Sequence, residues 1–266
     1  MTRPSQTGRD STERFSDRVD NYVRYRPGYP AGVLDVLRQE TGLTPASVIA
    51  DVGSGTGISA ALFLRKRNTV YGVEPNAEMR HAAESLLASD PETFARFRSV
   101  DGTAEATTLP ARSVDYVVAG QAFHWFDAER ARAEFARILR PGGWLVLMWN
   151  SRRQDSTPFL RAYESLLERF GTDYRQVRHT NIDPEALRPM FAGGDFTRRV
   201  LYNEQRFDLD GVRGRLLSSS YTPSASEPGY EPMLRELERI FAAHAEDGEI
   251  RFEYDTELYI GHVAGT

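Results

Sequence analysis

Cysteine is absent from the 266 residues of the sequence. This absence excludes disulfide bridges, thiolate metal ligands and a cysteine nucleophile. Histidine is also scarce, and its positions do not show the spacing of metal ligands, so we expect no metal site. The five histidines are His81, His124, His179, His244 and His262.

Positive charge is dispersed along the chain. Lys66 is the only lysine, no basic tract stands out, and the net charge is −5. This composition disfavours nucleic acid as the main partner, because phosphate binding needs concentrated positive charge. No apolar run approaches a membrane span, and the polar start of the chain has no signal-peptide core. We therefore expect a cytoplasmic protein that binds neither membrane nor nucleic acid.

Short apolar runs alternate with helical patterns up to residue 149. Apolar runs without internal alternation, separated by helices, are typical of a parallel sheet that is covered on both faces. We expect Pro141-Gly-Gly143 to stop the helix before the last of these strands. The expected strands are 48–50, 69–73, 97–100, 114–119 and 144–149, and the expected helices are 58–66, 77–88 and 128–139.

The pattern changes after Asn150. An antiparallel strand with one solvated face is indicated by the strict alternation of residues 250–260, and residues 196–207 alternate like an exposed strand. The remaining periodic segments predict helices. These segments are 158–170, 184–191, 209–217 and 232–245.

A glycine-rich turn, Asp51-Val-Gly-Ser-Gly-Thr-Gly57, joins the first strand to a helix. Glycines allow positive φ angles and a close approach of the backbone to a ligand. Ligands bind at the carboxyl ends of strands in open α/β sheets. Glu74 ends the second strand, where its carboxylate can accept hydrogen bonds from both hydroxyls of a ribose. The two features together predict a ligand that contains a nucleoside.

Two kinds of cofactor compete for this turn. A dinucleotide turn has the pattern G-x-G-x-x-G/A, whereas here Ile58 stands where the third small residue belongs. Asp51 would add negative charge beside a pyrophosphate, but it suits a ligand with an ammonium and a sulfonium group. No lysine follows the glycines, so a Walker loop is excluded. An NAD-dependent oxidoreductase stays open as the alternative enzyme.

Several motifs occur in order and together resemble the class I S-adenosylmethionine-dependent methyltransferases. They are Val48 to Gly57, Glu74, Asp101-Gly-Thr-Ala-Glu105, Val114 to Ala119 and Leu139 to Val146. Two further segments are similar to the small-molecule branch of methyltransferase type 11, which includes the trans-aconitate methyltransferases. These segments are Gln121-Ala-Phe-His-Trp-Phe126 and Tyr22 to Pro30.

The resemblance implies an α/β fold with a Rossmann-like, mostly parallel sheet of seven strands. The implied strand order is 3-2-1-4-5-7-6, with strand 7 antiparallel, helices on both faces and a helical insertion after strand 5. We expect a single domain over residues 1–266. Its expected parts are an N-terminal arm or lid (1–30), a cofactor-binding core (31–150), acceptor-side helical elements (151–195 and 208–246) and final strands (196–207 and 250–260).

The resemblance also places residues around S-adenosyl-L-methionine. Thr103 departs from the commoner Gly-Asp-Ala pattern, which leaves the contact with the adenine amine open. The implied cofactor residues are Asp51 at the methionine ammonium, Gly53, Ser54, Gly55 and Gly57 around the methionine part, Glu74 at the ribose, Pro75, Asn76 and Met79 beside the adenine, Thr103, Ala104 and Glu105 along the adenine edge, and Gln121 beneath the cofactor.

The methyl acceptor is expected to be a small molecule with a carboxylate or hydroxyl group, bound by a monomer or homodimer. His124 follows the fourth strand and is the candidate general base, with packing as the alternative role. Arg26 belongs to an arginine- and tyrosine-rich arm that either clamps an acidic acceptor or is simply solvated. The candidate acceptor-binding residues are Tyr22, Arg26, Trp125 and Trp149. A non-catalytic protein that binds S-adenosylmethionine stays open as the other alternative.

Overall fold

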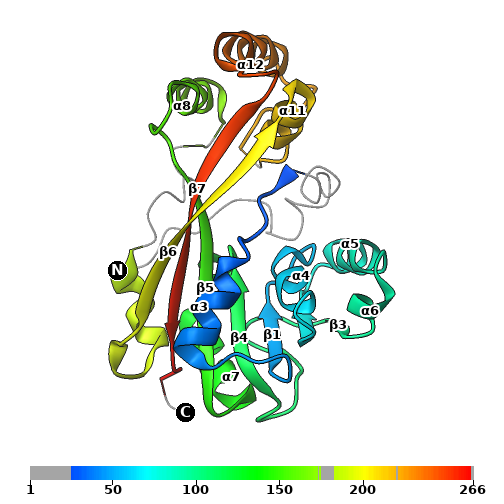
Figure 1. Cartoon of the computed structure of the whole chain (residues 1–266), viewed down its shortest axis with the longest axis vertical. Helices are drawn as coiled ribbons and strands as arrows, with labels where there is room; N and C mark the ends of the chain where they lie inside the picture. Colours follow the sequence, from blue (N-terminus) through cyan, green and yellow to red (C-terminus); the bar gives the residue numbers. More distant parts are fainter. Residues whose placement is uncertain (1–24, 173, 175–182, 220, 265–266) are drawn as a thin grey trace.

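The computed structural model describes residues 25–172, 174, 183–219 and 221–264. Its sheet has the order β3-β2-β1-β4-β5-β7-β6, with β7 antiparallel to both of its neighbours and all other pairs parallel (Figure 1). This result confirms the order and the antiparallel final strand that the resemblance implied. The strands are β1 (Val48–Val52), β2 (Thr69–Val73), β3 (Phe97–Val100), β4 (Val114–Gly120), β5 (Leu139–Arg152), β6 (Thr197–Phe207) and β7 (Ile250–Gly261).

Helices cover the two faces of the core sheet, and several begin where the sequence supplies a cap. Asn76 and Asp127 accept backbone N–H groups at the starts of α5 and α7, and Gly42 ends α3 with φ 72°. Apolar residues fill one core on each face of the sheet, one centred on α7 and the other on α3 and α4. These helices are α3 (Gly32–Thr41), α4 (Ile58–Leu64), α5 (Ala77–Leu87), α6 (Pro91–Phe94) and α7 (Ala128–Ile138).

Three further helices form what we call the helical cap. These helices, α8 (Pro158–Phe170), α11 (Leu209–Leu217) and α12 (Tyr230–His244), surround a third apolar cluster with the ends of β6 and β7. Figure 1 shows the cap at the far end of the long strands, away from the core helices. The third cluster includes Phe252 and Tyr254 of β7, so the cap is built on strands that extend out of the core sheet.

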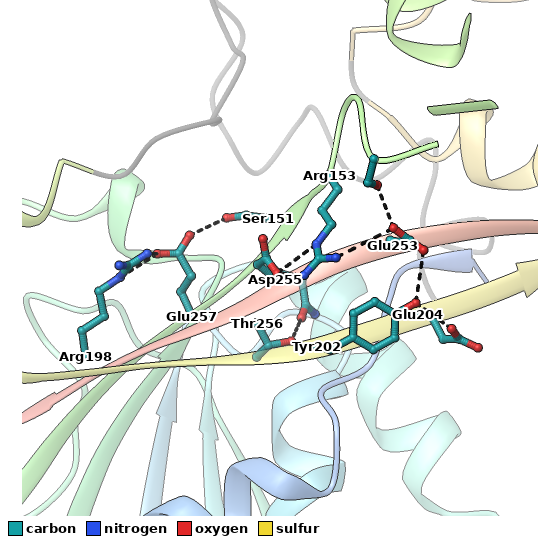
Figure 2. A network of polar contacts seen from close by, with 11 residues as sticks. Ser151, Arg153, Arg198, Tyr202, Glu204, Glu253, Asp255, Thr256 and Glu257 are labelled. Atoms are coloured by element: carbon teal, nitrogen blue, oxygen red, sulfur yellow. Dashed lines mark hydrogen bonds and ion pairs between the residues drawn. The ribbon is translucent and has the colours of Figure 1, made fainter. Parts of the chain in front are cut away.

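Strand β7 has one buried and one polar face, as its alternation predicted. Phe252 and Tyr254 point into the cap, whereas Asp255 and Glu257 lie on the other face. On that face the Arg153 guanidinium is 2.7 Å from Asp255, and the other members of the network are Ser151, Arg198, Tyr202, Glu204 and Glu253 (Figure 2). The polar network binds three strands together on the side opposite the cap.

The structure corrects the expected bounds of two elements and adds a third element. Strand β5 begins at Leu139, before the Pro-Gly-Gly turn, because Leu139 pairs with Val114 across an irregularity in the register. The segment 184–191 is not one helix but α10 (Pro184–Leu187) followed by a 3₁₀ turn (Arg188–Met190), and Pro189 inside the segment cannot donate a helical hydrogen bond. Helix α6 was not predicted. No helix in the described ranges is long and apolar enough to cross a lipid bilayer.

Candidate functional site

The glycine-rich turn lies at the carboxyl end of β1. Gly53, Gly55 and Gly57 all have positive φ, at 68°, 52° and 82°. A Cβ at Gly53 would lie 2.5 Å from the Cβ of Ala122, and a Cβ at Gly57 would lie 3.2 Å from the Cβ of Ala83. A Cβ at Gly55 would meet no heavy atom within 4 Å. Two of the glycines are therefore needed for packing, and Gly55 borders the open space that a ligand can approach.

Asp51 is completely buried at the end of β1. Its Oδ2 accepts a hydrogen bond from the Ser59 hydroxyl at 2.7 Å, but its Oδ1 has no hydrogen-bond partner in the described structure. Burial raises the pKa of Asp51 from 3.8 to about 7, against the lowering effect of the Ser59 hydrogen bond. A nearby cation would stabilise the ionised carboxylate of Asp51 against the cost of its burial, so Asp51 fits the cationic methionine end of S-adenosylmethionine.

Glu74 links the glycine turn to the start of α5. Its Oε2 accepts from the backbone N–H of Gly55 and its Oε1 from that of Asn76, both at 3.0 Å. Burial raises the pKa of Glu74, and the two backbone N–H groups and the Arg80 charge oppose this rise. Each carboxylate oxygen still has a lone pair available, so Glu74 can accept two ribose hydroxyls while it holds the turn.

Arg80 is a positioning residue that the sequence interpretation missed. Its Nη1 donates to the carbonyls of Glu74 and Pro75, at 2.7 and 2.9 Å, and to Asp101 at 3.1 Å. These contacts tie the end of β2 to the segment that follows β3. The only signal in the sequence was its place one turn after the helix-capping Asn76, which gives Arg80 the reach to fold back over the turn.

The predicted adenine edge is a short turn closed by its own backbone. Thr103 donates to the carbonyl of Ala106 at 3.1 Å and accepts from the N–H of Ala106 at 3.3 Å. Ala104 is buried, and the Glu105 carboxylate accepts the backbone N–H of Asp127 at 2.8 Å. The Glu105 side chain therefore anchors the start of α7. The buried Met79 and the capping Asn76 lie on α5, at the neighbouring strand end.

The end of β4 is held by Gln121. This residue has φ 58°, its N–H donates to the carbonyl of Met148 at 2.9 Å, and its Nε2 donates to the carbonyl of Asn150 at 3.1 Å. A 3₁₀ turn (Phe123–Trp125) follows, and it presents His124 and Trp125 on the surface with ring centroids 4.7 Å apart. Gln121 thus fixes the direction in which the candidate base leaves the strand.

Trp149 does not line an open wall, contrary to expectation. Its side chain is only 3% exposed and lies between Phe123 and Tyr259, with ring centroids 6.4 and 5.8 Å away. The reason is that both faces of β5 are covered here, and Trp149 lies in the same core cluster as Leu145 and Leu147. Trp149 therefore supports the turn that carries His124.

The described part of the N-terminal arm, residues 25–30, is held by side-chain amides. Asn150 Nδ2 donates to the carbonyls of Pro27 and Gly28, at 3.3 and 3.2 Å. Asn203 Nδ2 donates to Gly28 at 2.8 Å, and Gln205 Nε2 donates to the carbonyl of Tyr25 at 3.3 Å. The arm therefore runs along β5 and β6. Tyr22 and the rest of residues 1–24 lie outside the described residues.

The two ends of the arm connect the helical cap to the end of β4. Arg26 Nη2 donates to the carbonyl of Ser218 at 3.0 Å, just after α11. At the other end, a Cβ on Gly120 would lie 2.6 Å from the Tyr29 hydroxyl, so a larger residue there would displace that ring. The Arg26 side chain thus contacts the cap, and Tyr29 closes over the strand end nearest the glycine turn.

Comparison with known proteins agrees with this geometry. A family model described as "Methyltransferase domain" matches residues 50–147. An uncharacterized methyltransferase of Mycobacterium bovis is 36% identical over 223 residues, which cover 77% of this chain and 86% of that protein. An uncharacterized methyltransferase-like protein of Schizosaccharomyces pombe is 32% identical over 163 residues, covering 60% of this chain and 59% of that protein.

Solved structures share the fold. A structure from Anaeromyxobacter dehalogenans, provisionally named a type II methyltransferase, has a TM-score of 0.63 at 21% identity and covers 91% of this chain and 100% of that one. The chain belongs to the class I S-adenosylmethionine-dependent methyltransferases. Its cofactor is therefore S-adenosyl-L-methionine, which the Asp51, Gly55 and Glu74 geometry fits.

Proposed function

We propose that the chain methylates a small molecule with a carboxylate or hydroxyl group, bound between the end of β4 and the helical cap. The observation that carries the proposal is the arm, which joins the cap at Ser218 to the strand end at Gly120. An acceptor between these points would be enclosed on one side by the arm and on the other by the sheet. Such an enclosure suits a small molecule better than a polymer.

The protein's own part in the reaction is alignment and exclusion of water. The bound cofactor supplies a methyl group that its sulfonium already activates. Gln121 and Tyr29 border the strand end where the acceptor must meet that group. A carboxylate acceptor needs only to be oriented, whereas a hydroxyl acceptor gains from a general base, for which His124 is the candidate.

Methyl transfer from labelled S-adenosylmethionine to a panel of acceptors tests the proposal. The panel contains organic acids, phenols and amines, and total RNA and a protein extract are tested as separate acceptors. We expect label in one or more small molecules of the acid or phenol classes. Label found only in RNA or protein would overturn the proposal. Cofactor binding without methyl transfer to any tested acceptor would also overturn it and would indicate the non-catalytic alternative.

A further inference from the structure

Two arginines from distant parts of the chain lie beneath the helical cap, Arg215 buried and Arg152 with a side chain 11% exposed. Arg152 ends β5, and Arg215 lies in the last turn of α11, where its residue is 6% exposed. The Arg152 guanidinium stands over the ring of Tyr163 at 5.1 Å from the centroid, and Arg215 Nε donates to the Tyr254 hydroxyl at 3.3 Å. We call these four residues the Arg–Tyr cluster.

Arg152 has a complete set of partners. Its Nη2 contacts Glu164 and lies 3.2 Å from the hydroxyl of Tyr174. The Tyr174 hydroxyl in turn donates to Glu164 at 2.8 Å. The Arg152 guanidinium, the Tyr174 hydroxyl and the Glu164 carboxylate therefore each contact the other two.

Arg215 has no corresponding carboxylate partner among the described residues. Its hydrogen bonds go to Tyr254 and to the Ser219 hydroxyl, both neutral, and no Asp or Glu of the described residues is within ion-pair distance. The Tyr163 hydroxyl, in a residue 1% exposed, has no hydrogen-bond partner there either. The Arg215 charge acts on this hydroxyl and opposes the rise in the pKa of Tyr163 that burial causes. Burying a charge without a counter-charge and a hydroxyl without a hydrogen-bond partner is costly, and such costs are typical of binding sites.

We propose that Arg215 and Tyr163 bind a carboxylate group of the methyl acceptor, an inference that rests on the proposed function. Tyr254 is a positioning residue, because its hydroxyl accepts from Arg215 and donates to Gln205 at 2.9 Å. The bound carboxylate would complete a second arrangement of guanidinium, hydroxyl and carboxylate beside the one that Glu164 completes. One unpaired positive charge calls for a singly charged group, which favours a carboxylate over a phosphate.

The Arg–Tyr cluster lies some distance from the end of β4, so it would hold the acceptor at a group other than the one that is methylated. Arg152 pairs with Tyr254 across β5 and β7, and it lies two residues beyond Asn150, which accepts the Gln121 amide. At about 3.3 Å per residue, that is about 7 Å along the strand. The arm lies on the same face, because Gln205 contacts both Tyr254 and Tyr25. The acceptor would therefore carry its carboxylate some distance from the atom that is methylated.

Calorimetry on the full chain, saturated with S-adenosylhomocysteine, tests the site. The probes are citrate, succinate and benzoate, and the binding of each acid is compared with that of its neutral amide. Inorganic phosphate is tested separately. We expect at least one acid to bind and its amide not to bind. Arg215→Met should weaken acid binding at least tenfold and Tyr163→Phe several-fold. Arg213→Met is the matched control, since Arg213 lies on the same helix but pairs with Asp210 and Glu238 at the surface, and it should bind the acid as the wild type does.

Thermal unfolding without ligand separates binding from a structural role. Arg215→Met removes a buried charge whose partners are two neutral hydroxyls, and Tyr163→Phe removes a buried hydroxyl that has no hydrogen-bond partner in the described structure. Both variants should therefore melt no lower than the wild type. Lower melting of both variants would show a structural role and overturn the site. The site would also be overturned if either soluble variant bound the acid as tightly as the wild type does, or if the wild type bound phosphate but no acid.

The two proposals can fail separately. Methyl transfer only to uncharged acceptors, unchanged by Arg215→Met, would overturn the carboxylate site and leave the proposed function intact. Acid binding that Arg215→Met abolishes, without methyl transfer to any acceptor, would leave the site intact and overturn the proposed function.

Discussion

The half of the molecule that binds the cofactor and the half where we propose that the acceptor binds, called the acceptor half, are built differently. At the ends of β1 and β2, the contact of Gly55 with Glu74 spans 19 residues of sequence, and the donors are backbone N–H groups. Beneath the cap, the contact of Asn150 with Pro27 spans 123 residues and that of Arg26 with Ser218 spans 192, and the donors are side chains. Local backbone thus shapes the cofactor site, whereas long-range packing of side chains shapes the acceptor site.

This difference separates what a substitution can change in each half. A backbone N–H persists whatever side chain the residue carries, so the cofactor half depends on a few special positions, namely its glycines, Asp51 and Glu74. In the acceptor half, each contact belongs to one replaceable side chain. We therefore expect single substitutions to alter acceptor choice while cofactor affinity stays constant, and the following predictions test that separation.

The largest effect is expected from Asp51, through pH. Its folded-state pKa of about 7 lies above the ordinary value of 3.8, so the cofactor-free protein holds this proton more tightly than the unfolded chain does. Stability from this source is complete below pH 4 and is lost as pH rises to about 7. The loss amounts to roughly 4 kcal/mol, and Asp51→Asn should abolish it. Urea denaturation between pH 4 and pH 8 measures the difference.

A companion variant sharpens the Asp51 experiment. Ser59→Ala removes the hydrogen bond that lowers this pKa, so the loss of stability should extend to higher pH. Saturating S-adenosylmethionine should reduce the loss, because a cation stabilises the ionised carboxylate. Identical pH profiles of wild type and Asp51→Asn would contradict the role assigned to this residue.

Glu74→Ala should weaken cofactor binding more than a hundredfold. Two hydrogen bonds from ribose hydroxyls to a carboxylate contribute about 3 kcal/mol or more together, and the variant also frees the Gly55 end of the turn. Calorimetry with S-adenosylhomocysteine measures the loss. Glu78→Ala changes an exposed residue in the first turn of α5, and this control should bind the cofactor normally. Unchanged affinity of Glu74→Ala would refute a ribose-binding role.

His124→Ala tests the acceptor half with the smallest effect of the three. If the acceptor reacts through a hydroxyl, we expect kcat to fall about a hundredfold with cofactor affinity unchanged. If it reacts through a carboxylate, kcat should hardly change, because that group needs no base. His81→Ala, on the exposed side of α5, is the matched control. A loss of cofactor affinity in His124→Ala would break the proposed separation of the two halves.

The sequence predicted the two halves unequally, for a physical reason. Val48–Val52, the glycine turn and Glu74 lie close together in the chain, so their order alone placed them at one edge of the sheet. Trp149 was expected on an open wall but is buried, because an apolar strand does not reveal how far along its length the neighbouring elements cover it. No local pattern could show that the arm at Pro27 reaches Asn150.

Arg215 is the instructive omission. It stands three residues after Val212 and one before Leu216, both fully buried, so the helical period already placed a charge on the apolar face of α11. The sequence could have shown that Arg215 is buried. That Arg215 has no counter-charge among the described residues could not be read there, because Tyr254 and Tyr163 reach it from other elements.

The amide clamp on the arm has a consequence for how the protein responds to its medium. Asn150, Asn203 and Gln205 hold the backbone of residues 25–28 through neutral hydrogen bonds. Salt weakens interactions between charges and has little effect on bonds of this kind. The attachment of the arm at these carbonyls should therefore be insensitive to ionic strength, and a salt dependence of the Michaelis constant for an anionic acceptor would report on Arg215 rather than on arm opening.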